Sequence, residues 1–211
     1  MDFIDKAVEE YAATCTTAMP DLLEELTAAT YANLHAPNML TGRLEGGLLK
    51  MLVHLTSAVN VLEVGLFSGY SALSMAQALP AEGKIISLEK DQKVYEFAKS
   101  FIAQSPYGHK IEVHVGPALT TLETLALPPL DMVFLDADKR NNINYFEFLL
   151  PKVRANGLIV IDNTLWSGRV LQAEDKETIA IDALNKQLAA DPRVDVVLLP
   201  VRDGVTLVRK K

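Results

Sequence analysis

Cysteine is almost absent from this chain: Cys15 is the only one among 211 residues. No internal disulfide can therefore form, and we expect a reducing compartment, the cytoplasm, as the location. The sequence also lacks any apolar run close to the ~20 residues that a membrane-spanning helix needs, so we expect no membrane partner. Its first residues, Met1 to Lys6, lack the basic and then apolar pattern of a secretory signal peptide, which agrees with that location.

Positive charge is also in short supply. The chain has 20 Lys and Arg against 27 Asp and Glu, which gives a net charge of −7 and an isoelectric point near 5.1. Non-specific binding of nucleic acid needs a basic surface, so we expect no nucleic-acid partner. By contrast, 49% of the residues are hydrophobic and 22% are charged, a composition typical of a folded protein. Because repeats, linkers and low-complexity stretches are missing, residues 1–211 are predicted to form a single domain.

Apolar residues recur at helical spacing in the first quarter of the chain. They predict helices over residues 2–16 and 20–33. A third helix is marked by Leu44, Leu48, Met51 and Leu55. On the first helix, one stripe contains Ile4, Val8, Tyr11 and Cys15. We therefore expect Cys15 to pack against the rest of the protein.

Strands and helices alternate in the rest of the chain. Strands are predicted over 60–65, 84–89, 111–115, 130–136 and 158–162, and helices over 70–79, 91–104, from Pro117, over 142–153 and around Ile181, Leu184 and Leu188. Two last strands, 193–199 and 204–208, are joined by a short Asp-Gly connection and so form an antiparallel hairpin. The predicted fold class is α/β, a doubly wound and mostly parallel sheet with an antiparallel C-terminal hairpin and a helical N-terminal part.

A glycine turn follows the first predicted strand, in the segment Glu63-Val64-Gly65-Leu66-Phe67-Ser68-Gly69. A turn from a strand into a helix lets a ligand approach the backbone closely. Its glycines are four residues apart, so the dinucleotide fingerprint G-x-G-x-x-G is not satisfied, and a tight turn without a ligand is an equal alternative. Glu89, at the end of the next strand, favours a ligand, because a carboxylate there accepts hydrogen bonds from both hydroxyls of a ribose. Glu63 adds a second carboxylate for a cationic part of that ligand.

Acidic and amide side chains end two later strands. Asp136 ends the fourth parallel strand, and Asp162 with Asn163 ends the fifth. In an open parallel sheet these ends meet at one edge, where ligands bind. Two carboxylates and an amide oxygen suit Mg²⁺, Mn²⁺ or Ca²⁺, whereas zinc is disfavoured because no Cys or His is near. For each aspartate alone, capping of the following helix is an equal alternative.

Two further side chains follow these strand ends. Lys139, three residues after Asp136, is the candidate acid/base group, because an ammonium beside a dication is disfavoured. A solvated loop lysine is the alternative. Trp166, four residues after Asp162, offers a flat apolar wall for an aromatic substrate or, alternatively, a packing anchor.

Five segments carry a resemblance that runs from about Thr41 to the C-terminus. They are Leu62–Gly65 with Gly69–Ser71, Phe134–Lys139, Asp162–Gly168, Asp191–Val194, and Leu199-Pro200 with Asp203–Leu207. Together they resemble the cation-dependent, S-adenosylmethionine-dependent O-methyltransferases of the caffeoyl-CoA and catechol type, more narrowly their small bacterial members. The resemblance implies the Rossmann-like fold of class I methyltransferases and a homodimer.

The resemblance also implies the reaction and its residues. A methyl group would pass to one hydroxyl of a vicinal diol on a small aromatic substrate such as a catechol, a caffeoyl ester or a flavonoid. The implied donor site comprises Met39, Thr41, Glu63, Gly65, Ser71, Glu89, the backbone at Ala118, and Asp138. Asp136, Asp162 and Asn163 would bind the metal, which chelates both substrate oxygens, and Trp166, Lys139 and Asp136 would contact the substrate. Lys139 would take the proton before the oxygen attacks the methyl in line.

Three positions depart from the family pattern and leave the substrate open. Asn142 stands where members usually have tyrosine, Asn156 stands where a second glycine precedes Gly157, and Ser167 replaces an asparagine of the plant enzymes. Two other functions stay open at this point. One is methyl transfer to another class of acceptor, and the other is a non-catalytic nucleotide-binding module of the same fold.

Overall fold

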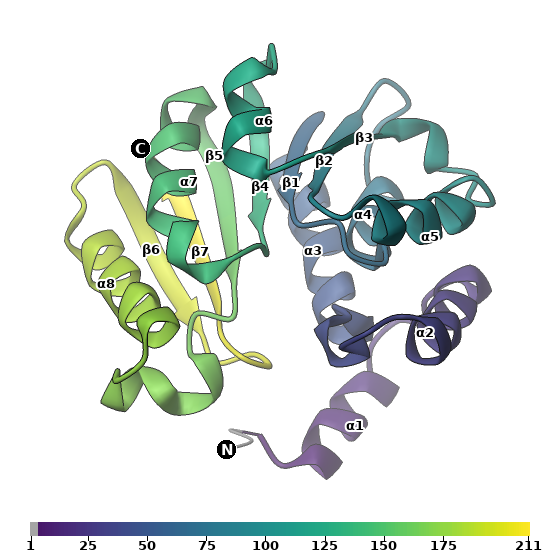
Figure 1. The fold of residues 1–211 in the computed structure, drawn as a ribbon, viewed down its shortest axis with the longest axis horizontal. Helices are drawn as coiled ribbons and strands as arrows, with labels where there is room; N and C mark the ends of the chain where they lie inside the picture. Colours follow the sequence, from purple (N-terminus) through teal and green to yellow (C-terminus); the bar gives the residue numbers. More distant parts are fainter. Residues whose placement is uncertain (1–3) are drawn as a thin grey trace.

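The computed structural model describes residues 4–211, so the start of the first predicted helix and residues Met1 to Phe3 lie outside it. Its centre is a seven-stranded sheet in the order β3-β2-β1-β4-β5-β7-β6 (Figure 1). The strands are β1 (Asn60–Val64), β2 (Lys84–Glu89), β3 (Ile111–Val115), β4 (Leu130–Leu135), β5 (Val153–Asp162), β6 (Val194–Leu199) and β7 (Val205–Lys210). The helices are α1 (Lys6–Thr14), α2 (Asp21–Asn33), α3 (Gly42–Thr56), α4 (Tyr70–Ala76), α5 (Gln92–Ile102), α6 (Ala118–Thr124), α7 (Asn142–Leu149) and α8 (Lys176–Ala190).

The pairing of the strands confirms the predicted sheet. The first five strands pair in parallel, whereas β7 lies antiparallel between β5 and β6. The antiparallel part follows from the short turn between β6 and β7, which reverses the chain at once. The strand order reverses between β1 and β4, and such a reversal is where open α/β sheets bind ligands.

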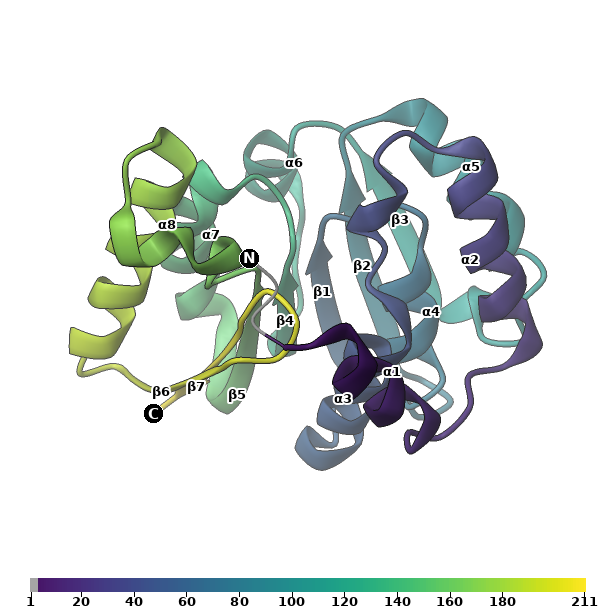
Figure 2. The same cartoon turned by 90° about the horizontal axis from the view of Figure 1, so that it is seen from below.

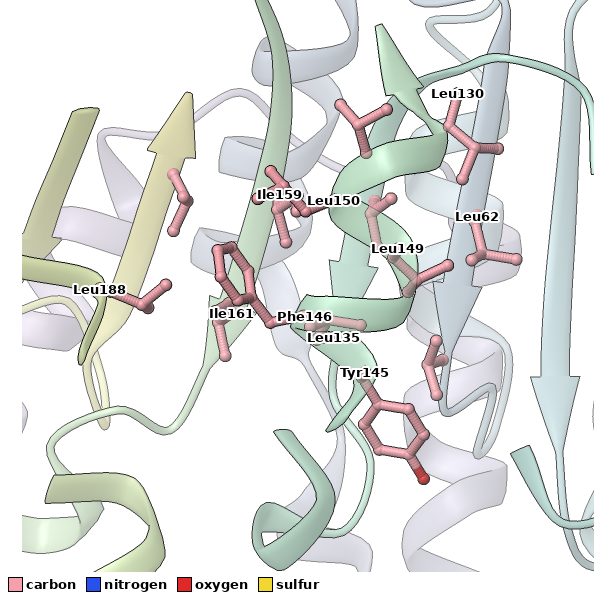
Figure 3. Packing of buried hydrophobic residues seen from close by; sticks show 14 of the residues in the cluster. Leu62, Leu130, Leu135, Tyr145, Phe146, Leu149, Leu150, Ile159, Ile161 and Leu188 are labelled. Atoms are coloured by element: carbon pink, nitrogen blue, oxygen red, sulfur yellow. The ribbon is translucent and has the colours of Figure 1, made fainter. Parts of the chain in front are cut away.

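Two hydrophobic layers hold helices on the two faces of the sheet. On one face, α7 and α8 pack on the central strands, and Figure 3 shows Phe146 and Leu149 of α7 lying against Ile159, Ile161 and the neighbouring strands. On the other face, α3 and α4 cover the alternate side chains of the same strands. The N-terminal helices extend this second layer, with α1 against α3 and α2 against α4 (Figure 2). This arrangement leaves the carboxyl ends of the strands available for a site.

Packing of the N-terminal helices differs from the sequence prediction. Cys15 was expected to be packed but is exposed, and α1 buries none of its residues. Val8 and Tyr11 are 57% and 70% exposed, because the described part of the chain leaves that face of α1 open to solvent. The third predicted helix is present as α3, but its Met51 and Leu55 face outward.

The junction between α7 and β5 also differs from the prediction. The helix predicted to reach residue 153 ends at Leu149, because Pro151 has no N–H to donate to the preceding turn. Strand β5 then begins at Val153 and contains a register shift opposite β4. Asn156 adopts a left-handed backbone, φ +61°, within this irregular stretch. Asparagine tolerates that conformation better than most residues, which explains how it replaces the glycine of the family pattern.

No helix within residues 4–211 is both long and apolar enough to cross a membrane.

Candidate active site

The strand ends around the switch point are joined by backbone hydrogen bonds. After β1, the N–H groups of Gly65 and Leu66 donate to the carbonyl of Leu88 at 3.0 and 3.1 Å. After β4, the N–H of Asp136 donates to the carbonyl of Val64 at 2.9 Å. The three loops that carry the predicted site residues of β1, β2 and β4 are therefore fixed relative to one another.

Gly65 lies where these loops touch. Its φ is +107°, and a Cβ there would lie 2.3 Å from the carbonyl oxygen of Asp136. Only glycine combines this backbone conformation with such a close approach. The turn at Gly65, predicted to bind the methyl donor, therefore contacts the backbone of Asp136, a predicted metal ligand.

Glu89 organises the turn that follows Gly65. Its two carboxylate oxygens accept hydrogen bonds from the N–H of Phe67 at 2.9 Å and of Asp91 at 3.0 Å. Phe67 adopts a left-handed backbone, φ +48°, so this bond stabilises an uncommon conformation. Each oxygen keeps a second lone pair, so the predicted acceptance of two ribose hydroxyls is compatible with these bonds and stays a prediction.

Glu63 has no exposed surface. It accepts a hydrogen bond from Ser71 Oγ at 2.5 Å and another from Ser87 Oγ. Burial raises the pKa of Glu63 to about 8, against the lowering effect of the two hydroxyls. The partners that the structure shows for Glu63 are thus α4 and β2, and the predicted contacts of Glu63 and Ser71 with a donor stay predictions.

Asp136 and Lys139 form an ion pair at the end of β4. Lys139 Nζ lies 2.9 Å from Asp136 Oδ1, and the lysine side chain is 7% exposed. The alternative of a solvated loop lysine is therefore excluded for this conformation. The next short helix, η3 (Lys139–Asn141), has Asp138 at its N-cap, so Asp136 is not the capping residue there.

Asp162 ends β5 beside Asp136, because β4 and β5 are neighbours in the sheet. Burial, and next to it the negative charge of Asp136, raise the pKa of Asp162 to about 6 against the lowering effect of Lys139. The following residue, Asn163, adopts a left-handed backbone, φ +58°, and donates its N–H to Asp162 Oδ1 at 2.7 Å. The predicted convergence of the two carboxylates is thus present.

The donor set fits a hard divalent cation. Two buried or half-buried carboxylates, one of them with a raised pKa, lie where a positive charge would stabilise both. Among residues 4–211, no three His, Cys, Asp or Glu side chains gather closely enough to hold a metal ion. The predicted set therefore depends on the amide of Asn163 as its third oxygen ligand.

The remaining predicted donor residues lie around this edge. Thr41 is buried at the start of α3, whereas Met39, in the 3₁₀ helix η1 (Pro37–Met39), is 56% exposed. Ala118 is half-buried at the start of α6. Asp138 is exposed and accepts a hydrogen bond from Tyr145 Oη at 2.7 Å.

Trp166 opens the loop helix η5 (Trp166–Gln172) with a left-handed backbone, φ +48°. Its ring is half-buried, and the guanidinium of Arg169 lies 5.6 Å from the ring centroid. Its Nε1 is buried and has no hydrogen-bond partner within the described residues. An acceptor wall and a packing anchor both stay predictions for this side chain.

Sequence reasoning missed two charged residues beside the site. Glu45 of α3 is 1% exposed, and its Oε2 lies 2.6 Å from Arg202 Nη1, from the turn between β6 and β7. The charge of Asp162 acts on Glu45, which places this carboxylate near the end of β5. A signal was available, because Glu45 shares the buried helical stripe of Leu49, Leu52 and Val53.

Comparison with known proteins decides the family. A model of the O-methyltransferase family matches residues 12–211. The chain belongs to this family. The O-methyltransferase is 40% identical over 205 residues to caffeoyl-CoA O-methyltransferase of Petroselinum crispum, a match that covers 90% of this chain and 84% of the relative. It is also 40% identical over 201 residues to caffeoyl-CoA O-methyltransferase 2 of Petunia hybrida, covering 89% and 81%.

Solved structures agree with this assignment. The O-methyltransferase from Bacillus cereus, in complex with SAH, matches with a TM-score of 0.89 at 31% identity and covers 97% of both chains. TomG from Streptomyces achromogenes, in complex with SAM, matches with a TM-score of 0.90 at 29% identity, covering 97% of this chain and 96% of TomG. The predicted family, fold class and enzyme class, a S-adenosylmethionine-dependent O-methyltransferase, are therefore confirmed.

Proposed function

We propose that this O-methyltransferase transfers the methyl group of S-adenosylmethionine to one hydroxyl of a vicinal-dihydroxy aromatic compound, with Mg²⁺, or alternatively Mn²⁺ or Ca²⁺, at Asp136, Asp162 and Asn163. The observation that carries the proposal is the placement of Asp136 and Asp162 at the ends of adjacent strands, with Lys139 Nζ 2.9 Å from Asp136 Oδ1. The names of the plant relatives support an acceptor of the caffeoyl type, whose ring carries two adjacent hydroxyls.

The donor part of the proposal concerns the β1 and β2 ends. Glu89 would accept the ribose hydroxyls, and the turn at Gly65 would lie against the donor. Thr41 and Met39 would close the site from the start of α3, and Glu63, Ser71, Ala118 and Asp138 complete the proposed set. The close backbone contact of Gly65 with Asp136 supports this placement of the donor. It holds the turn at Gly65 next to the end of β4, where the acceptor would bind.

The chemical part concerns Lys139. Asp136, Asp162 and Asn163 would hold the cation, which would supply Lewis-acid chemistry and lower the pKa of the reacting hydroxyl. Lys139 Nζ would accept the hydroxyl proton, because a cation held beside it would disfavour its ammonium form, and Asp136, 2.9 Å away, orients Nζ toward that end of β4. The oxygen then forms a bond to the methyl carbon as the carbon–sulfur bond breaks, which leaves a neutral thioether. Asp136 and Trp166 would position the aromatic ring.

Activity with and without metal tests the proposal. Purified enzyme is assayed for methyl transfer to catechol, caffeoyl-CoA and a flavonoid, in EDTA and after addition of Mg²⁺ or Mn²⁺. We expect activity to vanish in EDTA and to return with metal, and Asp162→Asn to mimic the chelator. Asp182→Asn, on the surface of α8 in an ion pair with Lys186, is the matched control. Full activity in EDTA with metal absent by mass spectrometry would contradict cation dependence and leave a methyltransferase for another acceptor class.

Organisation and location belong to the same proposal. We propose that residues 1–211 act as one domain, that two chains form a homodimer as the resemblance implies, and that the enzyme works in the cytoplasm. Light scattering coupled to size-exclusion chromatography tests the dimer through its molar mass.

A further inference from the structure

The turn between β6 and β7, residues 200–204, contacts two segments that are far away in sequence. On one side it meets the loop that follows β5. The contacts there are the N–H of Thr164 to the carbonyl of Gly204 at 3.0 Å, the N–H of Leu165 to the carbonyl of Asp203 at 2.9 Å, and the N–H of Ser167 to the carboxylate of Asp203. Gly204 has φ +90°, and a Cβ there would lie 2.6 Å from Leu165 N, so the turn and the loop are in close backbone contact.

On the other side, the same turn reaches the start of α3 through Arg202. Its guanidinium donates to the carbonyl of Thr41, to the carbonyl of Leu40 at 3.1 Å and to Glu45 Oε2 at 2.6 Å. Arg202 itself has a left-handed backbone, φ +48°. One side chain therefore serves three acceptors in the 40–45 segment, which a planar, rigid guanidinium does with little further loss of freedom.

Arg202 also provides the positive charge beside the buried carboxylate of Glu45. The glutamate is 1% exposed, and its Oε1 has no hydrogen-bond partner among residues 4–211. Glu45 faces the carboxylate of Asp162 as well as the guanidinium of Arg202. A buried carboxylate without its cation is costly, so Arg202 both compensates a charge and fixes two backbone carbonyls.

We infer that Arg202 is a positioning residue for methyl-donor binding, which holds the segment of Thr41 against the loop of Asn163 and Trp166. The inference rests on the proposed function, because the donor role of Thr41 is part of that proposal. It differs from a purely compensating role, in which Arg202 matters only as the counter-charge of Glu45. The two roles separate when Glu45 is neutralised, since the carbonyls of Leu40 and Thr41 still lack their donor in an Arg202 variant.

The experiment measures SAH affinity by calorimetry, without metal or acceptor, together with the melting temperature. The variants are Arg202→Ala, the double variant Arg202→Ala/Glu45→Gln, and Arg209→Ala as a control from an exposed ion pair on β7. We expect Arg202→Ala to lower the melting temperature and to weaken SAH binding about tenfold or more. The double variant should recover much of the lost melting temperature, because it has no uncompensated buried charge, whereas its SAH affinity should stay about tenfold weak. Arg209→Ala should bind SAH as the wild type does.

Recovery of both quantities in the double variant would show that Arg202 only compensates Glu45, and would overturn the inference. Wild-type affinity in Arg202→Ala would overturn it as well. If Arg202→Ala does not fold, the double variant carries the test alone, because it has no uncompensated buried charge. Absence of SAH binding by the wild-type enzyme would instead overturn the proposed donor site, and the inference with it.

Discussion

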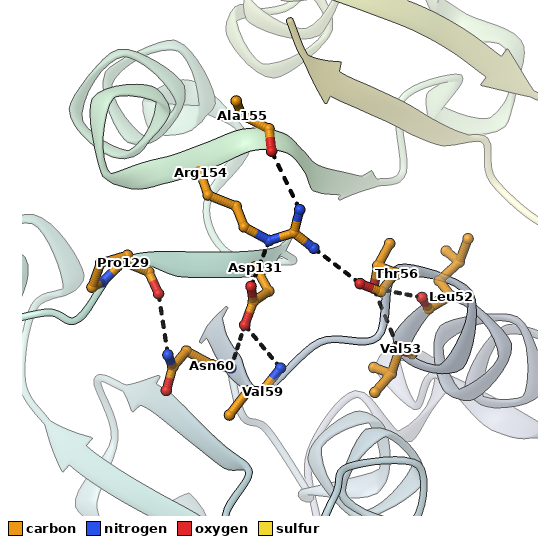
Figure 4. Close-up of polar contacts among 9 residues, drawn as sticks. All are labelled: Leu52, Val53, Thr56, Val59, Asn60, Pro129, Asp131, Arg154 and Ala155. Atoms are coloured by element: carbon orange, nitrogen blue, oxygen red, sulfur yellow. Dashed lines mark hydrogen bonds and ion pairs between the residues drawn. The ribbon is translucent and has the colours of Figure 1, made fainter.

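We expect Asp131 to contribute strongly to the stability of the fold. It lies near the start of β4, at the end of the central strands opposite the active site. Its Oδ2 accepts hydrogen bonds from the N–H groups of Val59 and Asn60, both at 2.8 Å, and its Oδ1 accepts one from Arg154 Nε at 2.6 Å (Figure 4). Arg154 continues to the carbonyl of Thr56 at 2.9 Å. The end of α3, the start of β1, β4 and β5 are thereby joined through one carboxylate.

The expected cost of Asp131→Ala follows from these bonds. A hydrogen bond to a charged group contributes about 1.5–3 kcal/mol, and two N–H groups would lose their acceptor. Because the Asp131 side chain is 14% exposed, water can replace some of the lost hydrogen bonds in the variant. We therefore expect a loss of about 3 kcal/mol in the free energy of unfolding. For a chain of this size, that corresponds to a fall of about 6–12 °C in melting temperature.

The pH dependence of the free energy of unfolding gives a second measure of the contribution of Asp131. Burial alone would raise the pKa of Asp131, but the hydrogen bonds from Asn60, Val59 and Arg154 outweigh it and hold the pKa below its usual value. The stabilisation is therefore complete above the unfolded-state pKa of about 3.9 and disappears as the pH falls through the lower folded-state pKa. The difference between wild type and Asp131→Ala should be constant near neutral pH and shrink in acid.

Denaturant unfolding of both proteins, from neutral pH down into the acid range, checks both expectations. Asp195→Ala is the control, because its partners Arg209 and Lys211 form an exposed pair with it that should contribute at most about 1 kcal/mol. An unfolding free energy of Asp131→Ala within 1 kcal/mol of the wild type would refute the reasoning. A change in SAH affinity of the folded variant would also refute the assignment of Asp131 to stability alone.

Three predictions concern the active site. Glu89→Ala should weaken S-adenosylmethionine binding about tenfold or more in calorimetry, since two ribose hydroxyls and the N–H of Phe67 lose a charged acceptor. The control is Glu82→Ala, at an exposed position, and unchanged affinity of Glu89→Ala would exclude this ribose site. Lys139→Ala should lower kcat by about 10²-fold or more while SAH affinity stays near that of the wild type, as for a lost general base. An undiminished kcat would assign the proton to another group. Trp166→Ala should raise KM for the aromatic acceptor more than it changes SAH affinity. Equal losses of both would identify Trp166 as a packing anchor.

Much of the fold and of the predicted site was determined by the sequence alone. Strands such as β2 and β3 have the predicted bounds, because short apolar runs between polar turns leave few other conformations. The strand ends at Gly65, Asp136 and Asp162 converge as expected, because parallel strands bring their carboxyl ends to one edge. The antiparallel hairpin followed from the length of its turn.

Local patterns were insufficient wherever the environment of a side chain depended on distant segments. The apolar stripe of α1 predicted a packed Cys15, yet periodicity does not specify whether another element covers it. The stripe marked by Met51 and Leu55 identified α3 correctly, but the buried face of that helix contains Glu45 instead. Helical spacing defines faces, and tertiary packing selects which face is buried.

The polar contacts around the site show most clearly what the sequence determines and what only the tertiary structure decides. The sequence placed the carboxylates of Asp136 and Asp162 at neighbouring strand ends, since that follows from topology. Only the tertiary structure paired Arg202 with Glu45 and with the carbonyl of Thr41, which lies 161 residues earlier in the chain. No local propensity encodes such a contact, because it exists only when the sheet has brought the β6–β7 turn against the start of α3.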